Sequence, residues 1–245
     1  MALSERQNDI LRILKEQKSV GVTALAKALY VSEATIRRDL TEMKSMGLVE
    51  RSHGGALLPE NAEEVSIFFR MEKNANEKER AATKAILHLP PFKSVFIDSS
   101  STALALAERI DLNFKTVVTN SLPTALQLSK KPNINLILLG GAVQFNTNSA
   151  TGSWTARQLS DFSFDLMISS CAAVLNGAAY ERSLDQKEIK RVAFGQCQKR
   201  ILLIDHTKFT AHGTYRLTDL SSYDLVITDK EPPEELLNKN IPFIY

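Results

Sequence analysis

The stretch VSEATIRRDLTEMKSMGLVERSHGGA, from Val31 to Ala56, decides how the amino-terminal part of this chain folds. It begins like a helix, because the side chain of Ser32 can accept a hydrogen bond from a first-turn N–H group. At about 3.6 residues per turn, Ile36, Leu40 and Met43 share one face of that helix. We expect this apolar face to pack inward and the opposite face to remain in solvent.

The opposite face of the helix carries small residues in its first turn and positively charged residues further along. Such a face suits the DNA major groove, where small residues allow a close approach and arginines reach base edges and phosphates. Gly47 is expected to end the helix, and LVERSHGGALL predicts two strands joined by a turn that carries Arg51 and His53 at its tip. The residues that we expect to contact DNA are Ser32, Ala34, Thr35, Arg37, Arg38, Thr41, Arg51 and His53.

Two amphipathic segments precede this stretch. ERQNDILRILKEQ predicts a first helix, and VTALAKALY predicts a short second helix with Thr23 as its N-cap. Three helices, a close turn at Tyr30 and Val31, and a β wing make a winged helix-turn-helix. The alternative is a small three-helix bundle whose charged face is merely solvated.

TIRRDL followed by R-x-HGGA resembles the DNA-binding signature of the DeoR-type bacterial transcription regulators. The resemblance extends from about Arg6 to Leu58 and rests on two separate blocks at the family's usual separation. It implies a sequence-specific regulator that binds double-stranded operator DNA of a carbohydrate-metabolism operon. In this family the regulator is usually a repressor that a phosphorylated sugar releases.

The composition is that of an ordinary globular protein with room for two domains. The 245 residues are 44% hydrophobic and 24% charged, and no apolar run approaches the ~20 residues of a membrane helix. Charged residues begin at Glu5, so we expect no signal peptide. The two cysteines form no CxxC, and the four histidines show no metal-ligand spacing. We therefore expect a cytoplasmic protein with no membrane partner, metal or cofactor.

The net charge is only +2. Residues 1–58 hold nine Lys and Arg against seven Asp and Glu, so the whole excess lies in the proposed DNA-binding part. A single headpiece with so few cations should bind operator weakly. We therefore expect a homodimer or homotetramer that engages several half-sites.

Beyond the wing we expect a linker at residues 59–73 and an effector-binding and oligomerisation domain at residues 74–245. NANEKERAATKAILHL predicts a helix with Ala81, Ala85, Ile86 and Leu89 inward. Short β-branched or leucine-rich runs then alternate with helical segments. This alternation predicts a largely parallel sheet covered on both faces, so the fold class is α/β.

In such sheets small molecules bind beyond the carboxyl ends of the strands. Polar and glycine residues follow five predicted strands, and a hydroxyl-rich loop before a helix can hold a phosphate. Lys208 would add positive charge. The alternative is that these residues only cap helices and form turns. The predicted effector-binding residues are Asp98, Ser99, Ser100, Ser101, Thr102, Asn120, Ser121, Gly140, Gly141, Cys171, Asp205 and Lys208.

The family resemblance continues more loosely over residues 74–245. DSSST resembles the family's D-x-G-S-T phosphate loop, and the TNS, GG and DHTKF blocks also resemble family blocks. Through them the larger domain resembles the ribose-5-phosphate isomerase or CoA-transferase-like fold. Ser100 stands where the family has glycine, and Gln186 lies near the position of a common glutamate. These two departures leave the identity of the effector open.

The sequence contains no HExxH, GxSxG, P-loop or dinucleotide GxGxxG motif. His206 beside Asp205 is the only candidate for acid–base chemistry, and resemblance in fold does not imply the reaction. We therefore expect a regulator and no enzyme. Two alternatives remain: a sugar-phosphate isomerase with an appended DNA-binding domain, and an activator or architectural DNA binder. Cys171 is expected to be a buried apolar residue and no redox sensor.

Overall fold

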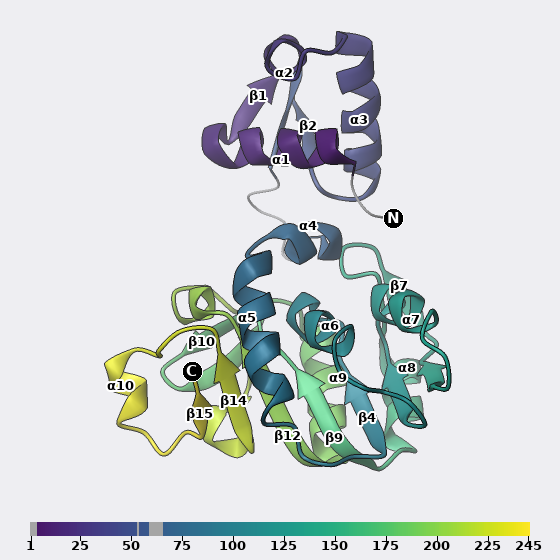
Figure 1. The fold of residues 1–245 in the computed structure, drawn as a ribbon, viewed down its shortest axis with the longest axis vertical. Coiled ribbons are helices and arrows are strands. Elements are labelled where there is room, and N and C mark those ends of the chain that lie inside the picture. Colours follow the sequence, from purple (N-terminus) through teal and green to yellow (C-terminus); the bar gives the residue numbers. More distant parts are fainter. Residues whose placement is uncertain (1–3, 53, 59–65) are drawn as a thin grey trace. The chain divides into compact units, whose positions relative to one another are not determined.

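The computed structural model describes residues 4–52, 54–58 and 66–245, apart from the side chain of Lys15. The chain divides into two compact units, Met1–Arg70 and Met71–Tyr245. Figure 1 shows the helices and strands of each unit. The predicted combination of a winged helix-turn-helix and a larger α/β unit is confirmed.

The first unit is built on three helices and a small sheet. Ile36, Leu40 and Met43 are fully buried in its core, together with residues of the first two helices. Gly47 follows the third helix with a φ of 67°, a conformation that glycine adopts without strain. The elements are α1 (Glu5–Gln17), β1 (Ser19–Gly21), α2 (Val22–Ala28), α3 (Glu33–Ser45), β2 (Glu50–Ser52) and β3 (Gly55–Leu57).

Two details of the predicted headpiece are wrong. The wing has three strands, in the order β1-β3-β2, whereas two were predicted. The additional strand, β1, has only three residues, which is too short for its sequence pattern to identify it. Thr23 does not cap α2. The helix begins at Val22, so Thr23 lies inside the first turn, where its hydroxyl donates to Glu33 at 2.6 Å and joins α2 to α3.

The predicted linker, residues 59–73, lies partly outside the described residues. Its later part forms a helix that the sequence did not predict, α4 (Ile67–Glu72), and α5 (Ala75–Ile86) follows. Ala81 and Ala85 are buried on α5 as expected, whereas the prediction for Ile86 was wrong, since 39% of its surface is exposed. The buried face of α5 runs through Lys78 and Ala82, which leaves Ile86 on the flank.

The core of the larger unit is a seven-stranded sheet in the order β15-β14-β12-β9-β4-β5-β6, and every pair in it is parallel. Its strands are β4 (Ser94–Ile97), β5 (Thr116–Thr119), β6 (Asn135–Leu138), β9 (Phe164–Ser169), β12 (Cys197–Ile204), β14 (Leu225–Thr228) and β15 (Phe243–Ile244).

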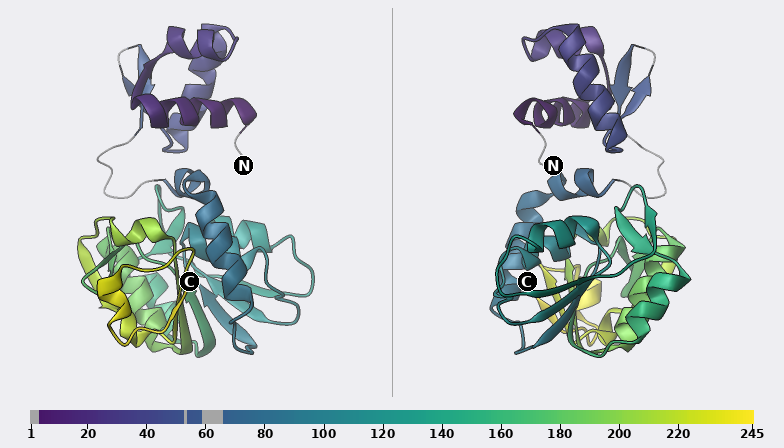
Figure 2. Two further views of the ribbon diagram at one scale, coloured as in Figure 1. Left: turned by 60° about the vertical axis from the view of Figure 1, so that its left-hand side comes forward. Right: turned by 90° about the vertical axis from the view of Figure 1, so that its right-hand side faces the viewer.

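Helices cover both faces of this sheet, as Figures 1 and 2 show. Val95 and Ile97 of β4 pack with α5 and α6, whereas Phe96 between them packs with α8 and α9. The helices and 3-10 turns are α6 (Ser101–Ala107), α7 (Leu122–Leu128), α8 (Ser153–Ser160), α9 (Leu184–Gly195), η1 (His206–Phe209), η2 (Leu220–Ser222) and α10 (Glu234–Leu237).

Two small antiparallel sheets accompany the main one, and the sequence did not predict them. One pairs β7 (Ala142–Gln144) with β8 (Ser149–Thr151). The other joins β10 (Ala173–Leu175), β11 (Ala178–Glu181) and β13 (Tyr215–Asp219). These strands are short, and several show no polar–apolar alternation: β7 is exposed along its whole length, and β8 is buried along its whole length.

The order of the main sheet creates one switch point. From β4 the chain proceeds to β5 and β6 on one side and then returns to β9, β12, β14 and β15 on the other. Ligands of open α/β sheets bind where the order reverses, outside the carboxyl ends of the strands. A ligand-binding site is therefore expected between the carboxyl ends of β4 and β9.

The buried face of α3 yields a stability prediction. We expect Leu40→Ala to lower the free energy of unfolding of the first unit by about 2–5 kcal/mol, because it leaves a cavity beneath a fully buried side chain. The measurement is urea unfolding followed by circular dichroism. Fluorescence of Trp154, the single tryptophan, should report an unchanged transition of the larger unit. The exposed neighbour Lys44→Ala serves as control, and an equal loss in both variants would contradict the prediction.

Candidate functional site

The outer face of α3 is exposed, as predicted. Ser32 is its N-cap, and its hydroxyl accepts from the backbone N–H of Thr35 at 3.2 Å. Arg37 pairs with Glu33 one turn earlier at 2.7 Å, so part of its charge is held within the helix. Among the described residues Arg38 forms no ion pair and is exposed, so its guanidinium is available to a ligand. Ala34 and Thr41 are exposed beside it.

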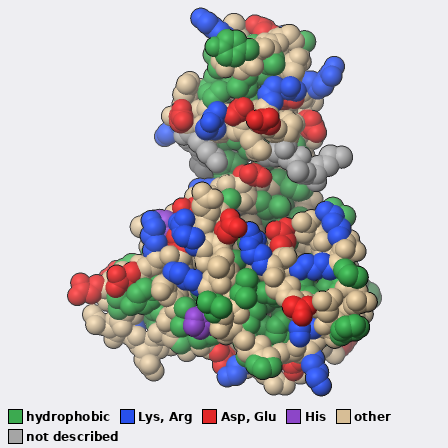
Figure 3. Space-filling model, in the orientation of Figure 1, with side chains coloured by type: hydrophobic (Ala, Val, Ile, Leu, Met, Phe, Trp, Pro, Cys, Tyr) green, Lys and Arg blue, Asp and Glu red, His purple; other side chains and the backbone are tan. Residues whose placement is uncertain are grey.

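The wing approaches the same helix. Arg51 lies within strand β2 and not at a hairpin tip, and its Nη1 is 3.5 Å from both the backbone oxygen of Arg37 and the hydroxyl of Thr41. The wing arginine and the third helix therefore share one surface. His53 lies outside the described residues. Figure 3 shows that charges of both signs intermingle on the visible face of this unit, in keeping with its small net charge.

A half-buried ion pair supports this surface from behind. Asp39, on the inner side of α3, accepts two bonds from the Arg6 guanidinium of α1, at 2.6 and 3.1 Å. Only 5% of Asp39 is exposed. Bidentate pairing of this kind sets the angle between two helices as well as their distance. The exposed residues of α3 are thus presented on a rigid support.

In the larger unit a buried lysine occupies the switch point of the sheet. Lys190 of α9 places its Nζ 3.1 Å from Asp98 at the end of β4 and 2.6 Å from Glu181 of β11. The same ammonium donates to the backbone oxygen of Ser170, beyond the end of β9, at 2.7 Å. All three charged side chains are buried. One cation therefore joins two strand ends and the small sheet.

Both members of the central pair are held in their charged forms. Burial by itself would raise the pKa of Asp98, but the charge of Lys190 and hydrogen bonds from Ser100 and Ser169 outweigh it and lower that pKa below its ordinary value. Burial would likewise lower the pKa of Lys190, yet Asp98 and Glu181 outweigh it and raise that pKa. The triad carries two negative charges and one positive charge.

Gln186 lies one turn before Lys190 on the buried face of α9. Both the oxygen and the nitrogen of its side-chain amide form hydrogen bonds. Its Oε1 accepts from the hydroxyl of Ser99 at 2.8 Å, and its Nε2 donates to Thr147 and Ser149 at 3.2 and 2.8 Å. A carboxylate at this position would have no N–H group for those two hydroxyls. The hydroxyl pair therefore matches the amide of Gln186.

The predicted phosphate loop is buried throughout, from Asp98 to Thr102. Ser100 accepts from the backbone of Ala103 at 3.2 Å and so caps α6, and its hydroxyl also donates to Asp98 at 2.5 Å. Ser121 caps α7 in the same way. These serines perform the capping role that the sequence left as an alternative, and they lie at the carboxyl ends of adjacent strands.

Among the described residues, one side-chain amide oxygen and one carboxylate oxygen buried at this edge have no hydrogen-bond partner. They are Oδ1 of Asn120, after β5, and Oδ2 of Asp205, after β12. Both residues are fully buried. Each oxygen is an acceptor, so a ligand or water that donates hydrogen bonds would satisfy it.

Other predicted residues have structural roles here. Gly140 and Gly141 are exposed, and a Cβ on Gly141 would lie 2.0 Å from the hydroxyl of Thr155, so the close approach that needs glycine is to α8. Cys171 is buried, and burial raises the pKa of its thiol to about 12, which keeps it protonated. Lys208 lies in η1, close enough to Cys171 to act on that pKa in the opposite direction.

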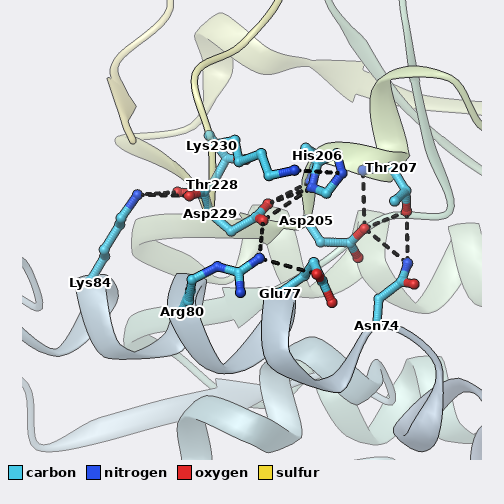
Figure 4. Close-up of polar contacts among 10 residues, drawn as sticks. All are labelled: Asn74, Glu77, Arg80, Lys84, Asp205, His206, Thr207, Thr228, Asp229 and Lys230. Atoms are coloured by element: carbon cyan, nitrogen blue, oxygen red, sulfur yellow. Dashed lines mark hydrogen bonds and ion pairs between the residues drawn. The ribbon is translucent and has the colours of Figure 1, made fainter.

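His206 pairs with Asp229 and not with its sequence neighbour Asp205. Its Nδ1 lies 3.0 Å from Oδ2 of Asp229, at the end of β14, and Arg80 of α5 contacts the same carboxylate at 3.2 Å (Figure 4). Asp205 turns the other way and accepts from the backbone N–H of Thr207 at 3.1 Å. These contacts tie α5 to the ends of β12 and β14.

Sequence reasoning missed the residues at the centre of the cluster, Lys190 and Glu181. One signal was present. Gln186 and Lys190 interrupt an otherwise apolar face of α9 that includes Ile189 and Ala193. Polar residues four apart on a buried face indicate a polar partner inside the fold.

No helix in the described part of the chain is long and apolar enough to span a membrane. Nor do the described residues contain a group of three or more His, Cys, Asp or Glu placed to hold a metal ion.

Residues 6–62 match the model of the DeoR-like helix-turn-helix domain, and residues 73–230 match that of the DeoR C terminal sensor domain. Among similar proteins, the transcriptional regulator GolR of Listeria innocua is 33% identical over 96% of this chain and 94% of its own length. The glycerol-3-phosphate regulon repressor of Escherichia coli is 31% identical over 97% and 95%. The lactose phosphotransferase system repressor of Staphylococcus aureus is 27% identical over 95% and 94%.

Among solved structures, ribose 5-phosphate isomerase A of Methanocaldococcus jannaschii aligns with a TM-score of 0.40 at 11% identity. The alignment covers 56% of this chain and 55% of the isomerase.

The buried lysine yields a second stability prediction. We expect Lys190→Met to cost about 3–5 kcal/mol at neutral pH, because two buried carboxylates lose their cation. The folded-state pKa of Asp98 is lowered, so the pair's contribution is present above the unfolded pKa of about 3.9 and is lost as the pH falls further. Urea unfolding at several pH values measures both effects.

The control for Lys190→Met is Lys199→Met, which removes an exposed lysine paired with Asp224. That variant should stay within about 0.5 kcal/mol of the wild type. Similar losses in the two variants would contradict a special role for the buried pair.

Proposed function

Because the chain belongs to the DeoR family of transcriptional regulators, we propose that it is a sequence-specific repressor whose operator affinity a phosphorylated sugar controls. The observation that carries the proposal is the exposed outer face of α3, with Ala34 at its front and an unpaired Arg38 behind it. A face of this shape fits the DNA major groove, and Arg51 of the wing adds a cation for the adjoining phosphates.

We assign operator binding to residues 1–58, a linker to residues 59–73, and effector binding and assembly to residues 74–245. The resemblance of the whole chain to repressors of glycerol-3-phosphate and lactose phosphotransferase systems supports a carbohydrate operon as the target. The polar edge of the main sheet supports a polar effector.

The effector site proposed for the larger unit is the carboxyl edge near the switch point. A sugar phosphate carries hydroxyl groups that donate hydrogen bonds and a phosphate that accepts them. The partnerless oxygens of Asn120 and Asp205 need donors, and the loop from Ser99 to Thr102 offers hydroxyls and backbone N–H groups. Lys208, after the next strand, would supply positive charge for the phosphate. Cys171 and the Gly140-Gly141 pair would lie at the border of this site.

The proposed mechanism is linkage between the two sites. A sugar phosphate that binds one arrangement of a dimer or tetramer more tightly than another shifts the population toward it. Operator affinity then changes, because the half-site spacing of a helix-turn-helix dimer is fixed by the DNA. The buried loop between Asp98 and Thr102 supports this mechanism, since effector entry would require that loop to move.

The first functional prediction concerns the third helix. We expect Arg38→Ala to weaken specific operator binding by about 1–3 kcal/mol, the usual value of one base or phosphate contact. Fluorescence anisotropy at fixed salt, with operator found by in vitro selection, measures the change. Arg191→Ala removes the same charge from the exposed surface of α9 and is the control. Equal affinities of the wild type and the Arg38 variant would remove α3 from the proposal.

The second functional prediction concerns the effector. We expect Lys208→Ala to bind operator normally while losing its response to phosphorylated sugars. A thermal-shift screen of triose to hexose phosphates, with inorganic phosphate as reference, identifies the effector, and its addition to the operator titration measures the response. Lys199→Ala, near the start of the same strand β12, is the matched control. An undiminished response in the Lys208 variant would place the phosphate elsewhere.

A further inference from the structure

One stretch of the larger unit carries no charged residue. The stretch from Pro132 to Ala156 contains no Asp, Glu, Lys, Arg or His, although charged residues make up 24% of the chain. It comprises β6, the β7–β8 hairpin and the first residues of α8. Thirteen of its residues are exposed to solvent, so burial does not explain the absence of charge.

Large apolar side chains project from the same stretch. The exposed fractions are 45% for Leu138, 54% for Val143, and 63% each for Phe145 and Trp154. Leu126, exposed to 63%, belongs to α7, which packs beside β6. In Figure 3 apolar side chains lie along the right-hand edge of the larger unit, where Figure 1 places α7 and α8. We call the surface formed by these five residues the neutral face.

Two open strand edges run along the neutral face. β6 is the last strand of the seven-stranded sheet, and β7 is paired with β8 alone. All three residues of β7 are exposed, whereas all three residues of β8 are buried, so β7 is the outer strand. Exposed edges are normally protected by lysine, proline or an inward-pointing charge. Neither strand carries such protection, which is typical of an edge that another chain covers.

We propose that a second copy of this chain covers the neutral face, in a two-fold symmetric dimer. In such a dimer the same patch lies on both subunits. A charged residue near the two-fold axis would therefore lie close to the identical charged residue of the other subunit. A patch without charge avoids that repulsion. It also offers no charge pattern by which a different partner would be selected.

The composition of the neutral face fits this occupant. The buried centres of dimer interfaces are depleted of charged residues and enriched in aromatic residues, here Phe145 and Trp154. A stable interface takes about 20–30 residues from each subunit, and the thirteen exposed residues of the uncharged stretch would form its centre. Charges of both signs stand at its border. Arg157 follows it directly, and Asp185 accepts from the amide of Gln144 at 3.1 Å.

The inference deepens the proposed function, because an operator with two half-sites requires two headpieces. It also explains how a headpiece with a net charge of +2 would reach useful affinity.

Sedimentation velocity over a range of concentrations tests the proposal. The wild type should dimerise, and Val143→Glu and Trp154→Glu should each weaken the dimer about 100-fold or more, because like charges then face each other. Leu87→Glu is the matched control, since it changes an apolar residue exposed to 81% outside the neutral face. A monomeric wild type, or glutamate variants that dimerise as it does, would overturn the proposal.

A second measurement does not depend on those variants. Cys171 and Cys197 are both buried, so Val143→Cys would introduce an accessible thiol on β7. A flexible bis-maleimide should join two copies of this variant and leave Leu87→Cys unlinked. Failure to join the Val143→Cys copies would contradict the assignment even if the protein dimerises elsewhere. The Arg38 and Lys208 experiments are independent, so either proposal can fail while the other stands.

Discussion

The larger unit depends on one buried cation. The side chain of Lys190 extends from α9 to the point where the strand order reverses. There its ammonium group pairs with Asp98 and donates a hydrogen bond to the carbonyl oxygen of Ser170. The ends of two adjacent parallel strands are thereby held at a fixed distance, and Glu181 brings the small antiparallel sheet to the same point. Truncation of either partner in such a pair is costly, because an unpaired charge cannot remain in a dry interior. The proposed effector loop begins at one member of the pair.

The same constraint explains why the proposed site is polar yet closed. Ser99 bonds to Gln186, and Ser100 caps α6 and bonds to Asp98, so these two hydroxyls are already engaged inside the protein. By contrast, Asn120 and Asp205 each retain a buried oxygen without a partner. A ligand that donates hydrogen bonds would satisfy these two acceptors. Gln186 supplies amide hydrogen-bond donors to Thr147 and Ser149 beside that edge.

The first unit was well predicted from the sequence, because the information in it is local. The spacing of Ile36, Leu40 and Met43 and the cap at Ser32 fix α3 independently of the rest of the chain. The prediction failed where the structure depends on distant residues. Thr23 bonds to Glu33 instead of capping its own helix, and β1 exists only because β3 is there to pair with it. In the larger unit the strands of the main sheet were predicted from their β-branched runs, whereas the short antiparallel strands left no periodic signal.

The sequence by itself determined the class of each unit, the apolar and polar faces of α3, and the polar residues that follow the parallel strands. Helix and strand periodicity, helix capping and turn formation depend on residues close together in the chain, so the amino-acid sequence alone reveals them. Only the tertiary structure decided which of those polar residues meet. It brought Lys190 to Asp98 across 92 positions of the chain and separated His206 from its neighbour Asp205 in favour of Asp229. The physical reason is that a buried charge takes its partner from whatever the fold places within reach, and sequence separation does not limit that choice.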